Sequence, residues 1–432
     1  MICDNLDINE LGHLTFSGFD TVDLVKKYGT PLYLLDENKI REKCHLYLET
    51  MHKYFGKDAL PLYASKANCF KQMYKIVGEE HIGIDVVSLG ELYTAHAAGF
   101  DLSKAFFHGN NKTDEDIYQA IKYNIGYFVV DNEEELLSLQ EIAQKEQVVQ
   151  KILIRITPGI DPHTYVEVAT GNVDSKFGNA IATGQADKIV ELALRQKNIR
   201  LVGLHCHVGS QVFTEDVHLK ALRIMLDFVK HIKDKYNYET EKLNLGGGFG
   251  VRYVESDPLI DIESKIREIA DEFHQVCHKL KIREPQILME PGRSLIADSG
   301  LTLYSVGSVK KIIGYKNYVS VDGGMTDNPR YALYKSSYTC LCANKMRESN
   351  NFKCDLVGRC CESGDIIQKD ILLPDSIRRN DLIAVCTTGA YNYSMSSNYN
   401  RLPKPPVVML KDKQDYLVVK RESYQDLIRN DI

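Results

Sequence analysis

The feature that most constrains this chain is a repeated alternation of short apolar runs with longer segments of helical periodicity. Each run is rich in β-branched and aromatic residues and ends in Gly, Ser, Asp or Pro. The eight runs lie at 61–68, 82–88, 104–109, 126–131, 151–159, 201–210, 242–250 and 286–294. Because parallel strands need crossover helices, eight strand-then-helix units predict a closed (β/α)8 barrel. An open doubly wound sheet is the alternative.

The segments between the runs carry helix signals. Ser88 with Glu91, and Thr113 with Asp116, predict side-chain caps at the starts of two helices. Before the first run, six apolar residues share one helical face. They are Ile40, Cys44, Tyr47, Leu48, Met51 and Phe55.

After residue 300 the pattern changes to strand-like runs rich in Val, Ile, Tyr and Thr. The start of the chain has the same character. These runs lie at 13–19, 31–36, 302–314, 317–324, 381–390 and 415–420. We therefore predict an α/β barrel over 37–299 and an all-β second domain, a sandwich or barrel, formed by 1–36 and 300–432.

Composition excludes several classes of protein. The net charge is −6 without a Lys/Arg run, so nucleic acid is not an expected partner. No apolar run reaches about 18 residues, which predicts no membrane span. The acidic N-terminus lacks a signal-peptide pattern, and 11 scattered cysteines argue against a disulfide framework. We therefore expect a cytoplasmic protein.

The active site of a barrel of this class lies at the C-terminal ends of its strands. The residues at the predicted ends are mostly polar or glycine. They are Lys66, Asp85, His108, Asp131, Arg155, His207, Gly246–Gly248 and Glu290–Arg293.

Lys66 lies in a run that is otherwise small or apolar. Burial in the barrel mouth would disfavour its charged form and suit Schiff-base formation. The alternative is a lysine that extends to the barrel edge. The glycines of LNLGGGFG could hold a phosphate with their backbone N–H groups, or could form only a tight strand-to-helix turn.

His205 and His207 alternate along one strand and so point to the same side. No third ligand lies at a natural metal spacing, so we expect no metal site; His205 is interpreted as a core residue and His207 as a ligand-binding one. Glu290 could form an ion pair with Arg293, or could keep a pyridine nitrogen protonated.

The second domain contains GRCCESGD, DGGMTDNPRYALY and GAYNYSMSSNYN. Adjacent Cys361 and Glu362 suit a proton donor and an ammonium binder. A zinc site built from the cysteines is disfavoured because they include no C-x-x-C pair. The third segment gathers Tyr and Asn side chains, as a site for a polar substrate requires.

Taken in order, the motifs YASKAN, HVGSQ, GGGFG, EPGRS, DGGM, CESGD and GAYNYSMSSNYN resemble those of the fold-type III, alanine-racemase-like PLP-dependent decarboxylases. The resemblance is closest to the diaminopimelate decarboxylases and spans nearly the whole chain. It implies a PLP-binding barrel with a β-domain, working as a head-to-tail homodimer with shared active sites.

The resemblance also implies residue roles. Lys66 would form the Schiff base, His207 would stack on the PLP ring, and Glu290 would pair with the pyridinium nitrogen. Cys361, contributed by the partner subunit, would donate a proton, and Glu362 would bind the distal amine. The implied cofactor-binding set is Lys66, Asp85, His207, Ser210, Gly247, Gly248, Glu290, Gly292, Arg293 and Tyr391. The implied substrate-binding set is Arg293, Arg330, Tyr334, Glu362 and Tyr391.

The implied activity is a carboxy-lyase that converts meso-2,6-diaminopimelate to L-lysine and CO2, the last step of lysine biosynthesis. A D-ornithine, D-lysine or related diamino-acid decarboxylase is the main alternative. The ornithine branch typically has a C-D-G motif where this chain has CESGD. A non-catalytic PLP-binding homologue is disfavoured because Lys66, Glu290 and Cys361 are all present, and a racemase is disfavoured by CESGD and SMSSNYN.

Two positions depart from the family's pattern. Tyr331 stands where Pro is common, and Asn392 where Gly is common. Both flank residues with implied roles, so the resemblance bears more firmly on the cofactor than on the substrate. The polar, Gly-rich segment 160–185 is predicted to be a mobile active-site loop, with Lys176 and Phe177 in a closing role.

Overall fold

The computed structural model of the chain describes residues 1–160 and 172–432. The chain forms two compact units. Residues 43–250 and 260–294 make up the first, and residues 1–42, 251–259 and 295–432 make up the second.

The first unit is a closed barrel, as predicted. Within the described residues, its wall is a ring of eight strands in which every neighbouring pair is parallel. The strands are β5 (Leu60–Ala64), β6 (Gly83–Val86), β7 (Ala105–Phe107), β8 (Tyr127–Val130), β9 (Gln150–Thr157), β11 (Ile199–His205), β12 (Lys242–Asn244) and β13 (Gln286–Met289). β13 pairs with β5 and β8 with β9, so the open sheet is excluded. The two-residue strand β10 (Asn179–Ala180) pairs in parallel with the end of β9.

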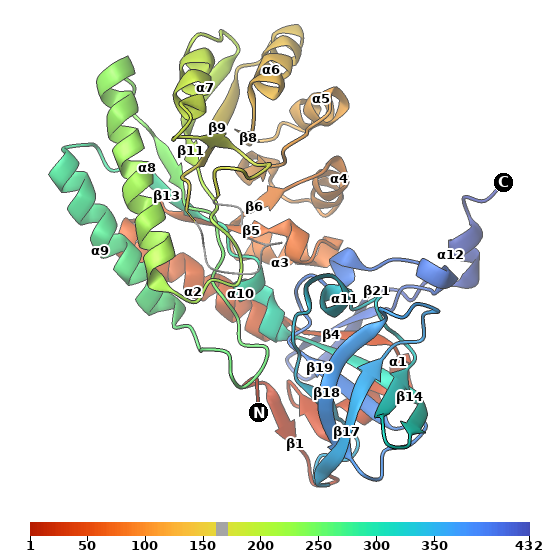
Figure 1. Ribbon diagram of the computed structural model, residues 1–432. Helices are drawn as coiled ribbons and strands as arrows, with labels where there is room; N and C mark the ends of the chain where they lie inside the picture. The colour runs from red at the N-terminus through yellow and green to blue at the C-terminus, as the bar shows by residue number, and fades with distance from the viewer. Residues whose placement is uncertain (161–171) are drawn as a thin grey trace. The chain divides into compact units, whose positions relative to one another are not determined.

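The barrel's helices lie outside the ring of strands (Figure 1). They are α2 (Glu37–Phe55), α3 (Lys71–Glu79), α4 (Leu89–Ala97), α5 (Asp114–Lys122), α6 (Glu133–Lys145), α7 (Gln185–Leu194), α8 (Glu215–Tyr236) and α9 (Ile262–Leu280). Thr113 and Asp116 form the predicted capping box of α5. Ser88 caps α4, whereas Glu91 reaches back to the N–H of Val87 rather than of Ser88.

An apolar layer fills the barrel beneath the polar strand ends. Its buried members come from six of the strands in the described part of the chain. They are Leu62, Phe106, Val129, Leu153, Val202 and Leu288. Burial of large side chains is worth roughly 1.5–3 kcal/mol each, so the barrel has a stable base on which to mount polar residues.

The second unit is built on a mostly antiparallel sheet of order β18-β17-β15-β14-β4-β20-β21, with β19 pairing to β14 and β16. The strands are β4 (Leu32–Asp36), β14 (Gly300–Ile312), β15 (Lys316–Val321), β16 (Cys340–Cys342), β17 (Asn350–Val357), β18 (Ile366–Pro374), β19 (Leu382–Cys386), β20 (Val407–Lys411) and β21 (Gln414–Val419). All six strand-like runs at the two ends of the chain contain strands. The pattern did not single out β16, β17, β18 or β20.

Smaller elements complete the second unit. Strands β1 (Leu6–Ile8), β2 (Leu14–Phe16) and β3 (Phe19–Asp20) form a separate sheet. The short helices are α1 (Thr21–Tyr28), α10 (Arg293–Ile296), which straddles the boundary of the two units, α11 (Arg330–Tyr334) and α12 (Tyr424–Ile428). None of the chain's 11 cysteines, all of which the structure describes, forms a disulfide. Among the described helices, none is both long and apolar enough to cross a bilayer.

Candidate active site

The strand ends of the barrel bring the predicted polar residues to one rim. Asp85 and Arg155 lie near the C-terminal ends of strands β6 and β9. Lys66 follows β5 in a 3-10 turn, Ser65–Ala67. His108, Asp131, His207, Gly246 and Glu290 come within two residues of the ends of their strands. The eight-fold alternation of the sequence therefore predicts which residues converge.

Lys66 occupies one of the two environments predicted for it. Its side chain is exposed, although its neighbours in the 3-10 turn, Ser65 and Ala67, are buried. The alternative interpretation, a lysine at the barrel edge, matches this position. Burial raises the pKa of the neighbouring Asp85 carboxyl to about 6, while His108 and Lys66 act in the opposite direction. An amine and a carboxyl thus interact at the mouth of the barrel.

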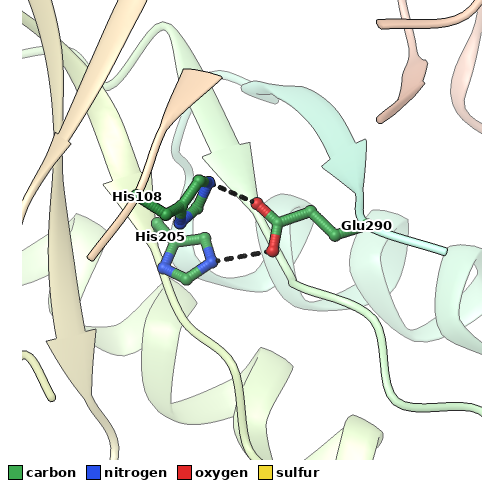
Figure 2. A group of neighbouring side chains, drawn as sticks. All are labelled: His108, His205 and Glu290. Carbon is green, nitrogen blue, oxygen red and sulfur yellow. Dashed lines mark hydrogen bonds and ion pairs between the residues drawn. The ribbon is translucent and has the colours of Figure 1, made fainter. Parts of the chain in front are cut away.

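Glu290 is the centre of a buried polar cluster (Figure 2). One carboxylate oxygen accepts a hydrogen bond from Asn244 Nδ2 at 2.7 Å and lies 2.9 Å from His108 Nε2. The other is 3.1 Å from His205 Nε2. Burial alone would raise the pKa of Glu290, but the two imidazoles hold it well below its usual range. The structure therefore places an ionised carboxylate inside the barrel.

The same cluster also forms a candidate metal donor set, whereas the expectation of no metal site stays a prediction. The candidate ligand atoms of His108, His205 and Glu290 lie within 4.8 Å of one another, a donor set that a divalent cation can use. Sequence spacing missed it because the three residues follow or end different strands. The five cysteines from Cys340 to Cys361 form no such group among the described residues.

His205 should make the barrel sensitive to acid. Burial lowers its pKa from 6.5 to about 4, so the unfolded chain takes up the proton first as the pH falls. The unfolding free energy should therefore decrease between about pH 6.5 and pH 4, by at most about 1.4 kcal/mol per pH unit from this group. His205→Gln should show a shallower decrease than the parent in denaturant titrations of the cofactor-free protein. His231→Gln, an exposed control, should retain the parent slope, and equal slopes for all three proteins would contradict the expectation.

The glycine-rich segment has the backbone that a phosphate site needs. Gly246 and Gly248 adopt φ angles of 69° and 112°, which favour glycine. The N–H of Gly247 donates to His207 Nδ1 at 3.3 Å. Burial lowers the pKa of His207 well below its usual value, with Lys66 contributing in the same direction, so the ring is neutral beside the amine.

Ser210 and Arg293 follow β11 and β13, the two strands that pair with β12 on either side of these glycines. Arg293 donates to Ser210 Oγ through Nε at 3.2 Å and through a terminal nitrogen at 3.1 Å. A Cβ added at Gly292 would lie only 2.9 Å from that of Ala64. The chain is therefore tightly packed where the predicted phosphate binders lie. An ionised carboxylate, a neutral imidazole, a glycine-rich segment and an exposed amine on one rim fit PLP.

In the second unit, Arg330 is a buried cation in an aromatic setting. It donates to Tyr338 Oη at 2.7 Å and to Ser336 Oγ at 3.2 Å, and its guanidinium lies 4.5 Å from the centre of the Tyr253 ring. Burial would lower its pKa, but the tyrosines more than offset this and raise it. Sequence analysis missed Tyr253 and Tyr338, since nothing local to either tyrosine marks it as a partner of Arg330.

The other predicted substrate residues are more accessible. Tyr334 ends α11 and is half-buried, whereas Cys361 and Glu362 are exposed in the turn between β17 and β18. Tyr391 has φ 62°, a strained backbone for a bulky residue and one that often marks a functional position.

Of the predicted loop 160–185, residues 161–171 lie outside the described part of the chain. The following residues are anchored to the barrel. The Arg155 guanidinium lies 4.4 Å from the centre of the Phe177 ring, and Gly178 N–H donates to Asp131 at 2.9 Å. Lys176 contacts the same ring at 4.9 Å. The closing role of Lys176 and Phe177 stays a prediction.

Comparison with known proteins places the chain among enzymes. A sequence profile for the family described as "Pyridoxal-dependent decarboxylase, pyridoxal binding domain" matches residues 37–297. The chain is 44% identical to the diaminopimelate decarboxylase of Bacillus methanolicus over 96% of each chain. It is 42% identical to that of Bacillus subtilis over 98% of this chain and 96% of the relative.

Solved structures of diaminopimelate decarboxylases also resemble this chain. The diaminopimelate decarboxylase of M. jannaschii in complex with L-lysine matches with a TM-score of 0.92 and 32% identity, covering 100% of this chain and 98% of that one. That of Helicobacter pylori, also with L-lysine, has a TM-score of 0.85 and 31% identity, covering 95% of this chain and 98% of that one. The chain therefore belongs to the PLP-dependent decarboxylase family, in its diaminopimelate decarboxylase branch.

Proposed function

We propose that this protein catalyses the PLP-dependent decarboxylation of meso-2,6-diaminopimelate to L-lysine and CO2, the last step of lysine biosynthesis. The observation that carries the proposal is the ionised Glu290 carboxylate, held inside the barrel by Asn244, His108 and His205. The choice of diaminopimelate as substrate is supported by the relatives that match over nearly the whole chain, which are named diaminopimelate decarboxylases.

When bound, PLP supplies the electron sink for the electron pair left on the α-carbon as CO2 departs. Lys66 would bind the cofactor through Nζ, and Glu290 would hold the proton of the pyridine nitrogen. His207 would orient the ring. The implied cofactor set also includes Asp85, Ser210, Gly247, Gly248, Gly292, Arg293 and Tyr391.

On the substrate side, Cys361 Sγ would deliver the proton that replaces the carboxylate, as a general acid. Glu362 would pair with the distal ammonium, and Arg293 and Arg330 with carboxylates, aided by Tyr334 and Tyr391. A planar guanidinium held by Tyr338 and Ser336 is pre-ordered for such pairing.

We further propose a cytoplasmic homodimer in which Cys361 acts on substrate held by the partner subunit. Residues 37–299 would form the PLP-binding domain, and residues 1–36 with 300–432 the second domain. The family profile over 37–297 supports the first of these bounds.

The test supplies PLP-loaded protein with one amino acid at a time and measures CO2 and amine. The panel is meso-diaminopimelate, its L,L isomer, D-ornithine, D-lysine and L-ornithine. We expect lysine from the meso isomer alone. Activity only on a D-amino acid without a distal carboxylate would overturn the substrate and leave the cofactor assignment standing, whereas cofactor binding without any CO2 release would favour a non-catalytic homologue.

A further inference from the structure

The turn between β17 and β18 carries Cys361 and Glu362, and it is closed by a buried carboxylate. Gly358 N–H donates to the carbonyl of Asp365 at 3.1 Å, and Asp365 N–H donates to that of Glu362 at 3.1 Å. Only 3% of Asp365 is exposed, whereas Cys361 and Glu362, which precede it in the same turn, are exposed. A charged group is costly to bury unless its oxygens accept hydrogen bonds, so its contacts need an explanation.

The Asp365 side chain connects this turn to a second loop. One oxygen accepts from Cys360 N–H at 2.7 Å, within the turn. The other accepts from Met325 N–H at 2.6 Å, in the segment that leads to Arg330. Arg359 N–H also donates to the carbonyl of Gly323 at 3.0 Å. One carboxylate thus fixes the turn against the loop that precedes the buried arginine.

Two glycines make room for this carboxylate. A Cβ at Gly324 would lie 2.5 Å from one Asp365 oxygen and 2.6 Å from the other, and one at Gly358 would overlap the same group. Real Cβ atoms do not approach so closely, so larger residues would displace the carboxylate. The space that the Asp365 carboxylate occupies therefore exists only because glycine stands at both positions.

The two adjacent cysteines, Cys360 and Cys361, differ in their relation to Asp365. Burial together with the neighbouring Asp365 carboxylate raises the pKa of the Cys360 thiol to about 12. Cys361 is exposed, and its N–H donates to Asn400 Oδ1 at 2.7 Å. A thiol whose pKa is raised in this way is a poor nucleophile, because its reactivity follows the thiolate.

We propose that Asp365 is a positioning residue that holds the Cys361–Glu362 turn in its working geometry and keeps Cys360 out of the reaction. The proposal rests on the proposed function for the role of Cys361 as proton donor. It adds the reason why, of two neighbouring cysteines, Cys361 is the one available.

The first test is thiol labelling of the full-length protein without substrate, followed by peptide mass spectrometry. In the parent, iodoacetamide should alkylate Cys361 faster than Cys360. In Asp365→Asn an amide NH2 faces one of the two N–H donors, so the turn should loosen and Cys360 labelling should accelerate at least about tenfold. Asp375→Asn, the same change at an exposed aspartate, should keep the parent rates.

The second test measures kcat and KM for meso-diaminopimelate on the same proteins. Displacement of the Cys361 sulfur by about 1 Å should lower kcat on the order of 10²-fold, with cofactor binding and melting temperature kept. Cys360→Ser retains the backbone N–H that donates to Asp365 and should stay near parent activity. If Asp365→Asn does not fold, Gly358→Ala replaces it, because its Cβ would displace the same carboxylate. It should show the same faster labelling of Cys360 and the same lower kcat.

Unchanged labelling of both cysteines in Asp365→Asn and Gly358→Ala would overturn the proposal, whatever the activity. Faster Cys360 labelling with a lower kcat supports it. Faster labelling with parental kcat supports the positioning of the turn and overturns instead the role of Cys361 as proton donor, so the two failures are distinguishable.

Discussion

Lys66→Ala should lower kcat for meso-diaminopimelate by about 10³-fold or more, because it removes both the amine proposed to bind the cofactor and a group able to move a proton. The side chain is exposed in the mouth of the barrel, so its loss leaves the packed layer of Leu62 and its neighbours intact. The melting temperature should therefore change little. Steady-state CO2 release and thermal unfolding together measure both effects.

The proposed covalent bond between Lys66 and the cofactor gives a second measurement. Borohydride should fix the cofactor to the Lys66 peptide of the parent and to no peptide of Lys66→Ala. Lys71→Ala removes an exposed lysine of α3 nearby and serves as the matched control, with parental activity and labelling. Normal turnover by Lys66→Ala, or attachment at another lysine, would show that the assignment is wrong.

Cys361→Ala should reduce kcat on the order of 10²-fold, the lower end of what loss of a general acid costs. The exposed thiol contributes no buried contact, so stability and cofactor binding should stay at parental values. Cys361→Ser should be nearly as slow, because a hydroxyl is a far weaker acid than a thiol. The informative measurement is kcat across pH, with Cys360→Ser as the control.

In D2O, product lysine from the parent should carry one deuterium at the carbon that lost the carboxylate, with a single configuration. Slow turnover by Cys361→Ala with unchanged configuration would indicate that water reaches the same face. Parental kcat in Cys361→Ala would rule the thiol out as donor and direct attention to another acid.

The barrel was predictable because its strands are short, apolar and bounded by residues that break them, which keeps each signal local. Parallel pairing then forces the strand ends, from Lys66 to Glu290, onto one rim. The sheet of the second unit was harder to predict from the sequence. β17 and β18 carry charged residues such as Lys353 and Lys369 and shift register at three points, so no clean alternation marks them.

The sequence predicted which residues lie at the rim of the barrel better than it predicted which of their side chains contact one another. Glu290 was expected at the rim, but its pairing with His108 and His205 depends on which way side chains point from strands far apart in the chain. Lys66 is exposed in its 3-10 turn, which matches the interpretation of a lysine at the barrel edge and not that of a buried one. Tyr253 and Asp365 act through long-range packing, which no local pattern encodes.

Strand β4 has a consequence for synthesis of the protein. All five residues of Leu32–Asp36 are buried, and their partners are β14, which begins at Gly300, and β20, which begins at Val407. At roughly 5–20 residues per second, β4 leaves the ribosome on the order of tens of seconds before either partner exists. An unpaired apolar strand invites association with other chains. The yield of folded protein therefore depends on what shields this strand until translation ends.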